Sequence, residues 1–197
     1  RTPTERANEL ITYCMRHLEE KHEKHRLYRI FYYDCPPVDG SRWHPFLHTN
    51  INFRKTEAYM WMTEFLEELR RRRKVALRLG ILADKQSSFT LSDTALKELC
   101  NGKKKWEDIS SSDFVLNLEQ KGIDMKIGVD IASLAFKRQV EQIVLISGDS
   151  DFVPAAKLAR REGIDFVLDP LHSNIKPELF EHIDGLCSHV KKPNKDK

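Results

Sequence analysis

The 197-residue chain has few cysteines and no long apolar run, and each of these shortages argues against a class of protein. Its four cysteines form no CxxC pair, which argues against a disulfide scaffold or a thiolate zinc site and favours a reducing compartment. No apolar run approaches the roughly 18 residues of a membrane helix, so no membrane association is expected. The first residues, Arg1-Thr2-Pro3, do not resemble a signal peptide. We therefore expect a cytoplasmic protein.

The apolar content is sufficient for a folded core. Hydrophobic residues make up 40% of the chain and aromatic residues 9%, which excludes wholesale disorder. The length fits one large domain, which we place at residues 1–188, with a flexible basic tail at 189–197. The net charge of +3 is unevenly distributed, because basic residues gather at 70–74, at 103–105 and in the tail while the remaining chain has an acidic excess. This distribution suits a protein that holds both a divalent metal and a polyanion, although lysine runs are also common as solvated surface.

Alternating helix and strand patterns predict an α/β fold with a mostly parallel sheet and helices on both faces. The best-specified unit has apolar strands at 143–146 and 164–168 and a helix from Pro154 to Arg161 between them, which is a βαβ pattern. The other predicted elements are a capped helix from Thr2, a strand at 28–33, a helix bearing Tyr59, Phe65 and Leu69, a strand at 75–82 and a helix near Asp124.

Two segments lack a clear pattern. Residues 38–52 show no periodicity and contain Gly40 and Pro45, so we predict a long loop. Residues 86–113 are polar and weakly patterned, and we interpret them as an excursion from the core within the same domain.

Aspartates follow several predicted strands, where ligands bind in open parallel sheets. Asp34, Asp149 and Asp169 each follow a strand, and Asp151 shares a tight turn with Asp149. Two ionised carboxylates on one turn repel each other unless a cation such as Mg²⁺ or Mn²⁺ neutralises them, and such an ion can promote phosphodiester hydrolysis. Helix caps and solvated turns are the alternative explanation of these aspartates.

Further residues fit the same hypothesis. Ser147 and Ser150 are candidates for hydrogen bonds to phosphate or to metal-bound water. Asp124 stands where a helix begins, and Asp130 lies about 240° further around an ideal helix, so we expect one of the two to lie in a loop or cap.

The segments Lys121-Gly122-Ile123-Asp124 with Asp130, and Ser147-Gly148-Asp149-Ser150-Asp151-Phe152-Val153-Pro154, resemble the NYN domain of LabA-like proteins, within the PIN-like nucleases. The resemblance implies a three-layer α/β/α fold and metal-dependent endonucleolytic cleavage of RNA. It implies that Asp124, Asp130, Asp149 and Asp151 coordinate one or two Mg²⁺ or Mn²⁺ ions, with Lys121 and Ser147 near phosphate.

The chain departs from this family at its start. NYN domains usually begin with a strand that ends in an Asp-Gly-x-Asn motif and supplies the first metal-binding aspartate, whereas here a helix is predicted almost from residue 1. We expect either that the natural chain is longer or that this protein lacks one strand and one ligand.

The leading hypothesis is a metal-dependent ribonuclease acting on single-stranded RNA. The unbroken positive run of Arg70, Arg71, Arg72 and Arg73 is a candidate RNA contact, because such a run favours a polyanionic partner. The first alternative is a non-catalytic RNA- or protein-binding NYN module. A haloacid-dehalogenase-like phosphohydrolase is disfavoured, because Asp34-Cys35-Pro36 does not supply its D-x-D nucleophile. A homodimer is left open.

Overall fold

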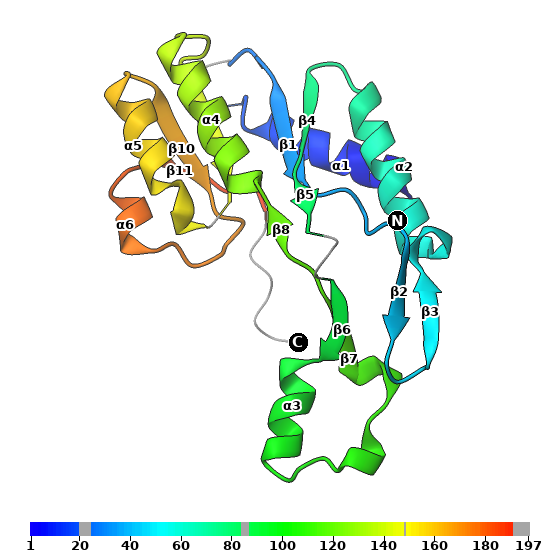
Figure 1. Ribbon diagram of the computed structural model, residues 1–197. Coiled ribbons are helices and arrows are strands. Elements are labelled where there is room, and N and C mark those ends of the chain that lie inside the picture. Colours follow the sequence, from blue (N-terminus) through cyan, green and yellow to red (C-terminus); the bar gives the residue numbers. More distant parts are fainter. Residues whose placement is uncertain (20–24, 84–86, 148, 191–197) are drawn as a thin grey trace.

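The computed structural model describes residues 1–19, 25–83, 87–147 and 149–190 of a mixed α/β protein (Figure 1). The helices are α1 (Pro3–Arg16), α2 (Glu57–Arg71), α3 (Asp93–Cys100), α4 (Ile123–Phe136), α5 (Val153–Arg161) and α6 (Pro177–Phe180). The strands are β1 (Ile30–Asp34), β2 (Ser41–His44), β3 (Thr49–Asn52), β4 (Val75–Leu79), β5 (Ile81–Leu82), β6 (Ser88–Leu91), β7 (Phe114–Asn117), β8 (Gln120–Lys121), β9 (Gln142–Ile146), β10 (Asp165–Asp169) and β11 (Gly185–Leu186). None of the helices in these ranges is long and apolar enough to cross a membrane.

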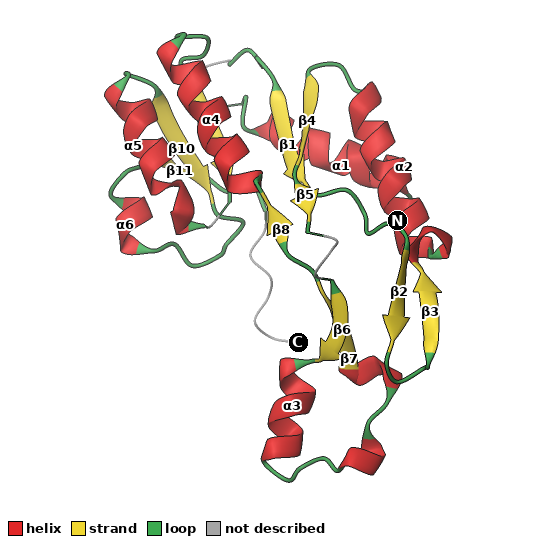
Figure 2. Ribbon diagram, in the orientation of Figure 1, coloured by secondary structure: helices red, strands yellow, loops and turns green. Residues whose placement is uncertain are grey.

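The parallel strands form two small sheets where one sheet was expected. β1 pairs with β4, from Ile30 opposite Val75 to Asp34 opposite Leu79. In the second sheet β10 lies between β9 and β11, and all three strands are parallel. Figure 2 shows β1, β4 and β10 running in the same direction, so their carboxyl ends lie toward the same edge.

Helices cover both faces of β1. Neighbouring side chains of a strand point to opposite faces, so Tyr32 and Tyr33 lie in different cores. Tyr32 packs into a core formed with α1 and α2, where Phe65 and Leu69 are buried. Tyr33 packs on the other face, into the core that α4 and α5 form with β9 and β10. The alternating residues of β1 therefore join two hydrophobic cores.

Most of the helices and strands predicted from periodicity are present. The helix predicted from Thr2 is α1, with Thr2 as its N-cap in a reciprocal capping box with Glu5. The predicted βαβ unit is β9, α5 and β10, and Gly163 adopts the positive φ of +81° that follows the end of α5.

The strand predicted at 75–82 is broken at Gly80 into β4 and β5. A Cβ atom on Gly80 would lie 2.7 Å from Ile123 Cδ1 and 2.8 Å from the Lys121 carbonyl oxygen. A residue with a side chain does not fit here, so the close approach of β8 and α4 to the end of β4 requires glycine.

The prediction of a long loop at 38–52 is wrong, because the structure contains an antiparallel hairpin there. β2 and β3 pair from Ser41 opposite Asn52 to His44 opposite Thr49. Their residues are mostly polar, so no apolar alternation marked the strands. The buried side chain of the pair is His44, whose ring lies 4.4 Å from that of Phe89, centroid to centroid.

The predicted excursion forms an outlying unit, which we define as residues 87–117. It contains α3 between the antiparallel strands β6 and β7, which pair from Ser88 opposite Asn117 to Leu91 opposite Phe114. Figure 1 shows this unit apart from the two parallel sheets, connected to them through β5 and β8. Most of the predicted basic tail, residues 191–197, lies outside the described residues.

Candidate functional site

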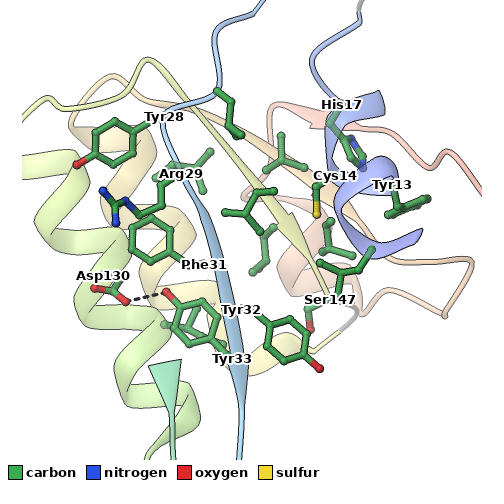
Figure 3. A pocket seen from close by; sticks show the side chains of 18 of the residues that line it. Tyr13, Cys14, His17, Tyr28, Arg29, Phe31, Tyr32, Tyr33, Asp130 and Ser147 are labelled. Atoms are coloured by element: carbon green, nitrogen blue, oxygen red, sulfur yellow. Dashed lines mark hydrogen bonds between the residues drawn. The ribbon is translucent and has the colours of Figure 1, made fainter. Parts of the chain in front are cut away.

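A cavity of about 1770 Å³ lies between the two parallel sheets. β1 lines one side and β9 the other, and α1 and α4 contribute further walls (Figure 3). Within the described residues β1 pairs with β4 alone and β9 with β10 alone. Each of the two strands therefore has one edge without a strand partner in the described structure, and both strands line the same cavity.

Three of the four predicted aspartates line this cavity. Asp124 and Asp130 come from α4, and Asp149 comes from the turn after β9, together with Ser147. Asp151 follows in the next turn and is exposed. The topology accounts for Asp149, because parallel strands deliver the residues at their carboxyl ends to one edge, whereas Asp124 and Asp130 reach the cavity from α4.

Asp130 is held firmly by two side chains. Its Oδ2 accepts a hydrogen bond from the Tyr33 hydroxyl at 2.9 Å and lies 2.8 Å from Arg78 Nε. Figure 3 shows the Tyr33 ring directed from β1 toward Asp130. Burial, and then the hydrogen bond to Asp130, raise the pKa of Tyr33, which keeps the hydroxyl protonated as a donor. Arg78 also lies over the ring of Phe31, with 5.1 Å between Cζ and the ring centroid.

The sequence reasoning missed Tyr33 and Arg78 as partners of an aspartate. The two residues are directly opposite each other in the β1–β4 pairing. The sequence carried a signal for each strand but none for which strands pair, so the shared contact with Asp130 emerges only from the fold.

The turn after β9 is organised by short local contacts. Ser147 Oγ accepts a hydrogen bond from the Asp149 amide at 3.2 Å, and Asp149 Oδ1 accepts one from the Asp151 amide at 3.1 Å. Asp149 and Asp151 are both exposed. The side chain of Ser150 and all of Gly148, which belong to the same predicted motif, lie outside the described residues.

The helix-cap alternative is wrong for the two aspartates to which it applied. The residue that caps α4 is Gly122, and α5 is preceded by Phe152 with no side-chain cap. The expectation that Asp124 or Asp130 lies in a loop or cap is also wrong, because α4 begins at Ile123 and contains both. Their wide separation around the helix remains, with Asp130 directed at β1 and Asp124 exposed.

The carboxylates do not converge on one point. Among the described residues, no three of the four aspartates have ligand oxygens within 4.8 Å of one another. Their donor chemistry nevertheless fits a hard cation such as Mg²⁺ or Mn²⁺, which prefers oxygen ligands. Asp124 and Asp149 are exposed, so they have room to rotate, whereas Asp130 is fixed by Tyr33 and Arg78.

The predicted basic contacts lie in two different places. Lys121 is on β8, immediately before α4, and its Nζ is 3.1 Å from Glu119 Oε2. The run from Arg70 to Arg73 closes α2 and precedes β4, so it stands at the opposite end of that strand from the aspartates. Arg70 forms an ion pair with Glu67, and Arg71 Nη1 lies 3.5 Å from Glu68 Oε1. Carboxylates of the same helix thus already neutralise part of this run.

A comparison with protein-family models matches residues 49–179 to the NYN domain. The matched segment is about two thirds of the chain and contains all four aspartates. No curated protein and no solved structure matches the chain. These findings give no support to a homodimer.

Proposed function

Because the chain belongs to the NYN family, we propose that it is a metal-dependent ribonuclease that hydrolyses phosphodiester bonds in single-stranded RNA. Membership of the family implies a PIN-like, nuclease-type fold, nucleic-acid binding and use of a divalent metal. The observation that carries the proposal is the position of Asp124 and Asp130 on α4 and of Asp149 after β9, which line one cavity between the two parallel sheets.

We further propose that the two parallel sheets belong to one three-layer α/β/α arrangement. The shared strand direction in Figure 2 and the helices on both faces of β1 support this. A strand of the Asp-Gly-x-Asn kind would find an edge to pair with on both β1 and β9. Its carboxyl end would lie near Asp149, where a further carboxylate would complete the ligand set.

The proposed metal ligands are Asp124, Asp130, Asp149 and Asp151, and the proposed ion is Mg²⁺ or Mn²⁺. Such an ion, when bound, lowers the pKa of water and stabilises the charge that develops on phosphate. Tyr33 and Arg78 fix the orientation of Asp130 and balance its charge.

The proposed phosphate contacts are Lys121, Ser147 and Ser150. Lys121 is exposed and its ion pair with Glu119 is solvated, so its ammonium group is able to exchange this partner for phosphate. Arg70 to Arg73 stand at the far end of β4, so in this proposal they contact RNA that extends beyond the cleavage site.

The direct test is the Asp149→Asn variant, assayed for cleavage of single-stranded RNA in Mn²⁺. The amide keeps the size of the side chain and removes its charge, so we expect activity to fall by about 100-fold or more while the fold is retained. Asp165→Asn is the matched control, because Asp165 is an exposed aspartate at the opposite, amino end of β10. Full activity of Asp149→Asn would contradict the proposal.

A non-catalytic RNA-binding module is the second candidate. It is favoured by the separation of the carboxylates, of which no three come within 4.8 Å in the described residues, and by the engagement of Asp130 with Arg78. This candidate predicts salt-sensitive RNA binding by the wild type, equal binding by Asp149→Asn, and no cleavage by either in Mg²⁺ or Mn²⁺.

A further inference from the structure

A second group of metal-binding side chains joins the end of α1 to the segment after β11. It consists of His17, Cys187 and His189, whose ligand atoms all lie within 4.8 Å of one another. Of the described residues, these alone form such a group of three or more histidine, cysteine or acidic side chains. We propose that they bind a zinc ion. The three residues lie outside the segment 49–179 and include none of the four aspartates; His17 also lines the aspartate cavity, whereas Cys187 and His189 do not.

The spacing of the group is close to that of a zinc site. Tetrahedral zinc with Zn–S of about 2.3 Å and Zn–N of about 2.0–2.1 Å has neighbouring ligand atoms about 3.3–3.6 Å apart. Cys187 Sγ and His189 Nε2 are already 3.3 Å apart. The rings of His17 and His189 are 4.5 Å apart, centroid to centroid, and nearly perpendicular at 84°. Closing the group around an ion therefore needs movements of about an ångström.

Asp169 supplies the supporting contact that zinc-binding histidines usually have. Its carboxylate is fully buried, and Oδ2 lies 3.0 Å from His17 Nε2. Because this contact engages Nε2, Nδ1 is the ring nitrogen of His17 left to bind a metal. Such carboxylate–histidine pairs behind a zinc ion fix the ring and increase its basicity.

The surroundings of Asp169 also favour a cation nearby. The other partners that the structure describes for this carboxylate are the Tyr13 hydroxyl and the Leu171 amide, the latter at 2.9 Å from Oδ1. No lysine or arginine is among these described partners, and burial of a charge without a counter-charge is unfavourable. A zinc ion bound to His17 would place positive charge close to it.

The donor set selects zinc over the ions proposed for the aspartates. One thiolate and two imidazoles suit Zn²⁺, whereas Mg²⁺ and Mn²⁺ prefer oxygen ligands. Three protein ligands leave a fourth position for water. Because His17 ends α1 and Cys187 and His189 follow β11, the ion would tie two distant parts of the chain together.

The first experiment is a titration of the full, chelator-treated chain with Co²⁺ and Zn²⁺. We expect one Co²⁺ per chain with a thiolate-to-cobalt charge-transfer band, and displacement of that band by one equivalent of Zn²⁺. Cobalt bound to aspartates alone has no thiolate ligand and gives no such band, so failure of this site and failure of the nuclease proposal are distinguishable.

Variants assign the ligands. Cys187→Ser should abolish the charge-transfer band and weaken Zn²⁺ binding by at least about 10-fold, measured by competition with a chromophoric chelator. Cys14→Ser is the matched control, because Cys14 lies on the same helix as His17 but is not in the ligand group, and it should retain both properties. If Cys187→Ser does not fold, His189→Gln should keep the band and weaken Zn²⁺ binding. Absence of the band in the wild type, or its loss in Cys14→Ser, would overturn the proposal.

Discussion

The contact between Tyr33 and Asp130 can be tested by removing one oxygen atom. In Tyr33→Phe the ring that packs between β1 and α4 is kept, and the hydrogen bond of 2.9 Å to Asp130 Oδ2 is lost. Any change in stability therefore reports on the hydroxyl rather than on packing.

The expected magnitude follows from the remaining partners of the carboxylate. A hydrogen bond to a charged group contributes about 1.5–3 kcal/mol. Arg78 Nε still lies 2.8 Å from the same oxygen, and the Asp130 side chain is 21% exposed, so the carboxylate keeps a partner and some water. We therefore expect a loss at the lower end, about 1–2 kcal/mol in the free energy of unfolding.

Urea unfolding measures this difference. We expect the urea concentration at the midpoint of unfolding to fall by about 0.5 M while the dependence of the unfolding free energy on urea (the m-value) is unchanged. Tyr28→Phe is the matched control, because the exposed Tyr28 hydroxyl lies 3.4 Å from Gln139 Oε1 and its removal should cost about 0.5 kcal/mol or less. If Tyr33→Phe is no less stable than Tyr28→Phe, the hydroxyl does not hold Asp130, and the argument that Asp130 is pre-positioned fails.

Two further predictions concern the same region. Burial and then Asp130 raise the pKa of Tyr33 above its ordinary value of 10.0, so above about pH 10 the unfolded chain releases a proton that the folded chain keeps. Stability should therefore fall as pH rises past that point, and the difference between wild type and Tyr33→Phe should shrink when urea midpoints at about pH 8 and pH 11 are compared. Gly80→Ala should lower thermal stability, by about 1–3 kcal/mol in free energy, because its Cβ would meet the Lys121 carbonyl oxygen at 2.8 Å. The same change at Gly128, where no atom of the described structure lies within 4 Å of the added Cβ, should be stabilising by about 0.5–1 kcal/mol, and the opposite order would refute the contact.

Elements determined by neighbouring residues could be predicted from the sequence. Thr2 and Glu5 cap α1 through contacts three residues apart, and the apolar runs of β9 and β10 flank a helix whose first turn contains Pro154. These patterns involve residues close together in the sequence, so they can be recognised without knowledge of the tertiary fold. The cavity-lining position of Asp149 follows from the strand pattern of β9 and the parallel topology.

The features that could not be predicted depend on pairing between distant segments. Asp169 ends β10, and Asp149 follows β9, yet the Asp169 carboxylate is buried against Tyr13 of α1 and His17 at its end. The absence of a CxxC motif argued against a thiolate zinc site, but a motif search does not detect residues that meet only in the fold, as the proposed ligands His17 and Cys187 do. Chain connectivity alone does not indicate which helix end meets which strand end.

The outlying unit is joined to the parallel sheets by a very short ladder, since β5 and β8 pair at only two positions, Ile81 with Lys121 and Leu82 with Gln120. It also packs against the β2–β3 hairpin, where the rings of Phe89 and Phe114 lie against His44. Its described contacts are with this hairpin and the short ladder rather than with β9 and β10, so we expect the unit and the hairpin to open together, at a lower cost than global unfolding. Amide protons of β6 and β7 would then exchange as one group, ahead of those in the core. Because residues 87–117 do not line the aspartate cavity, we expect insertion, deletion or replacement there to disturb it little.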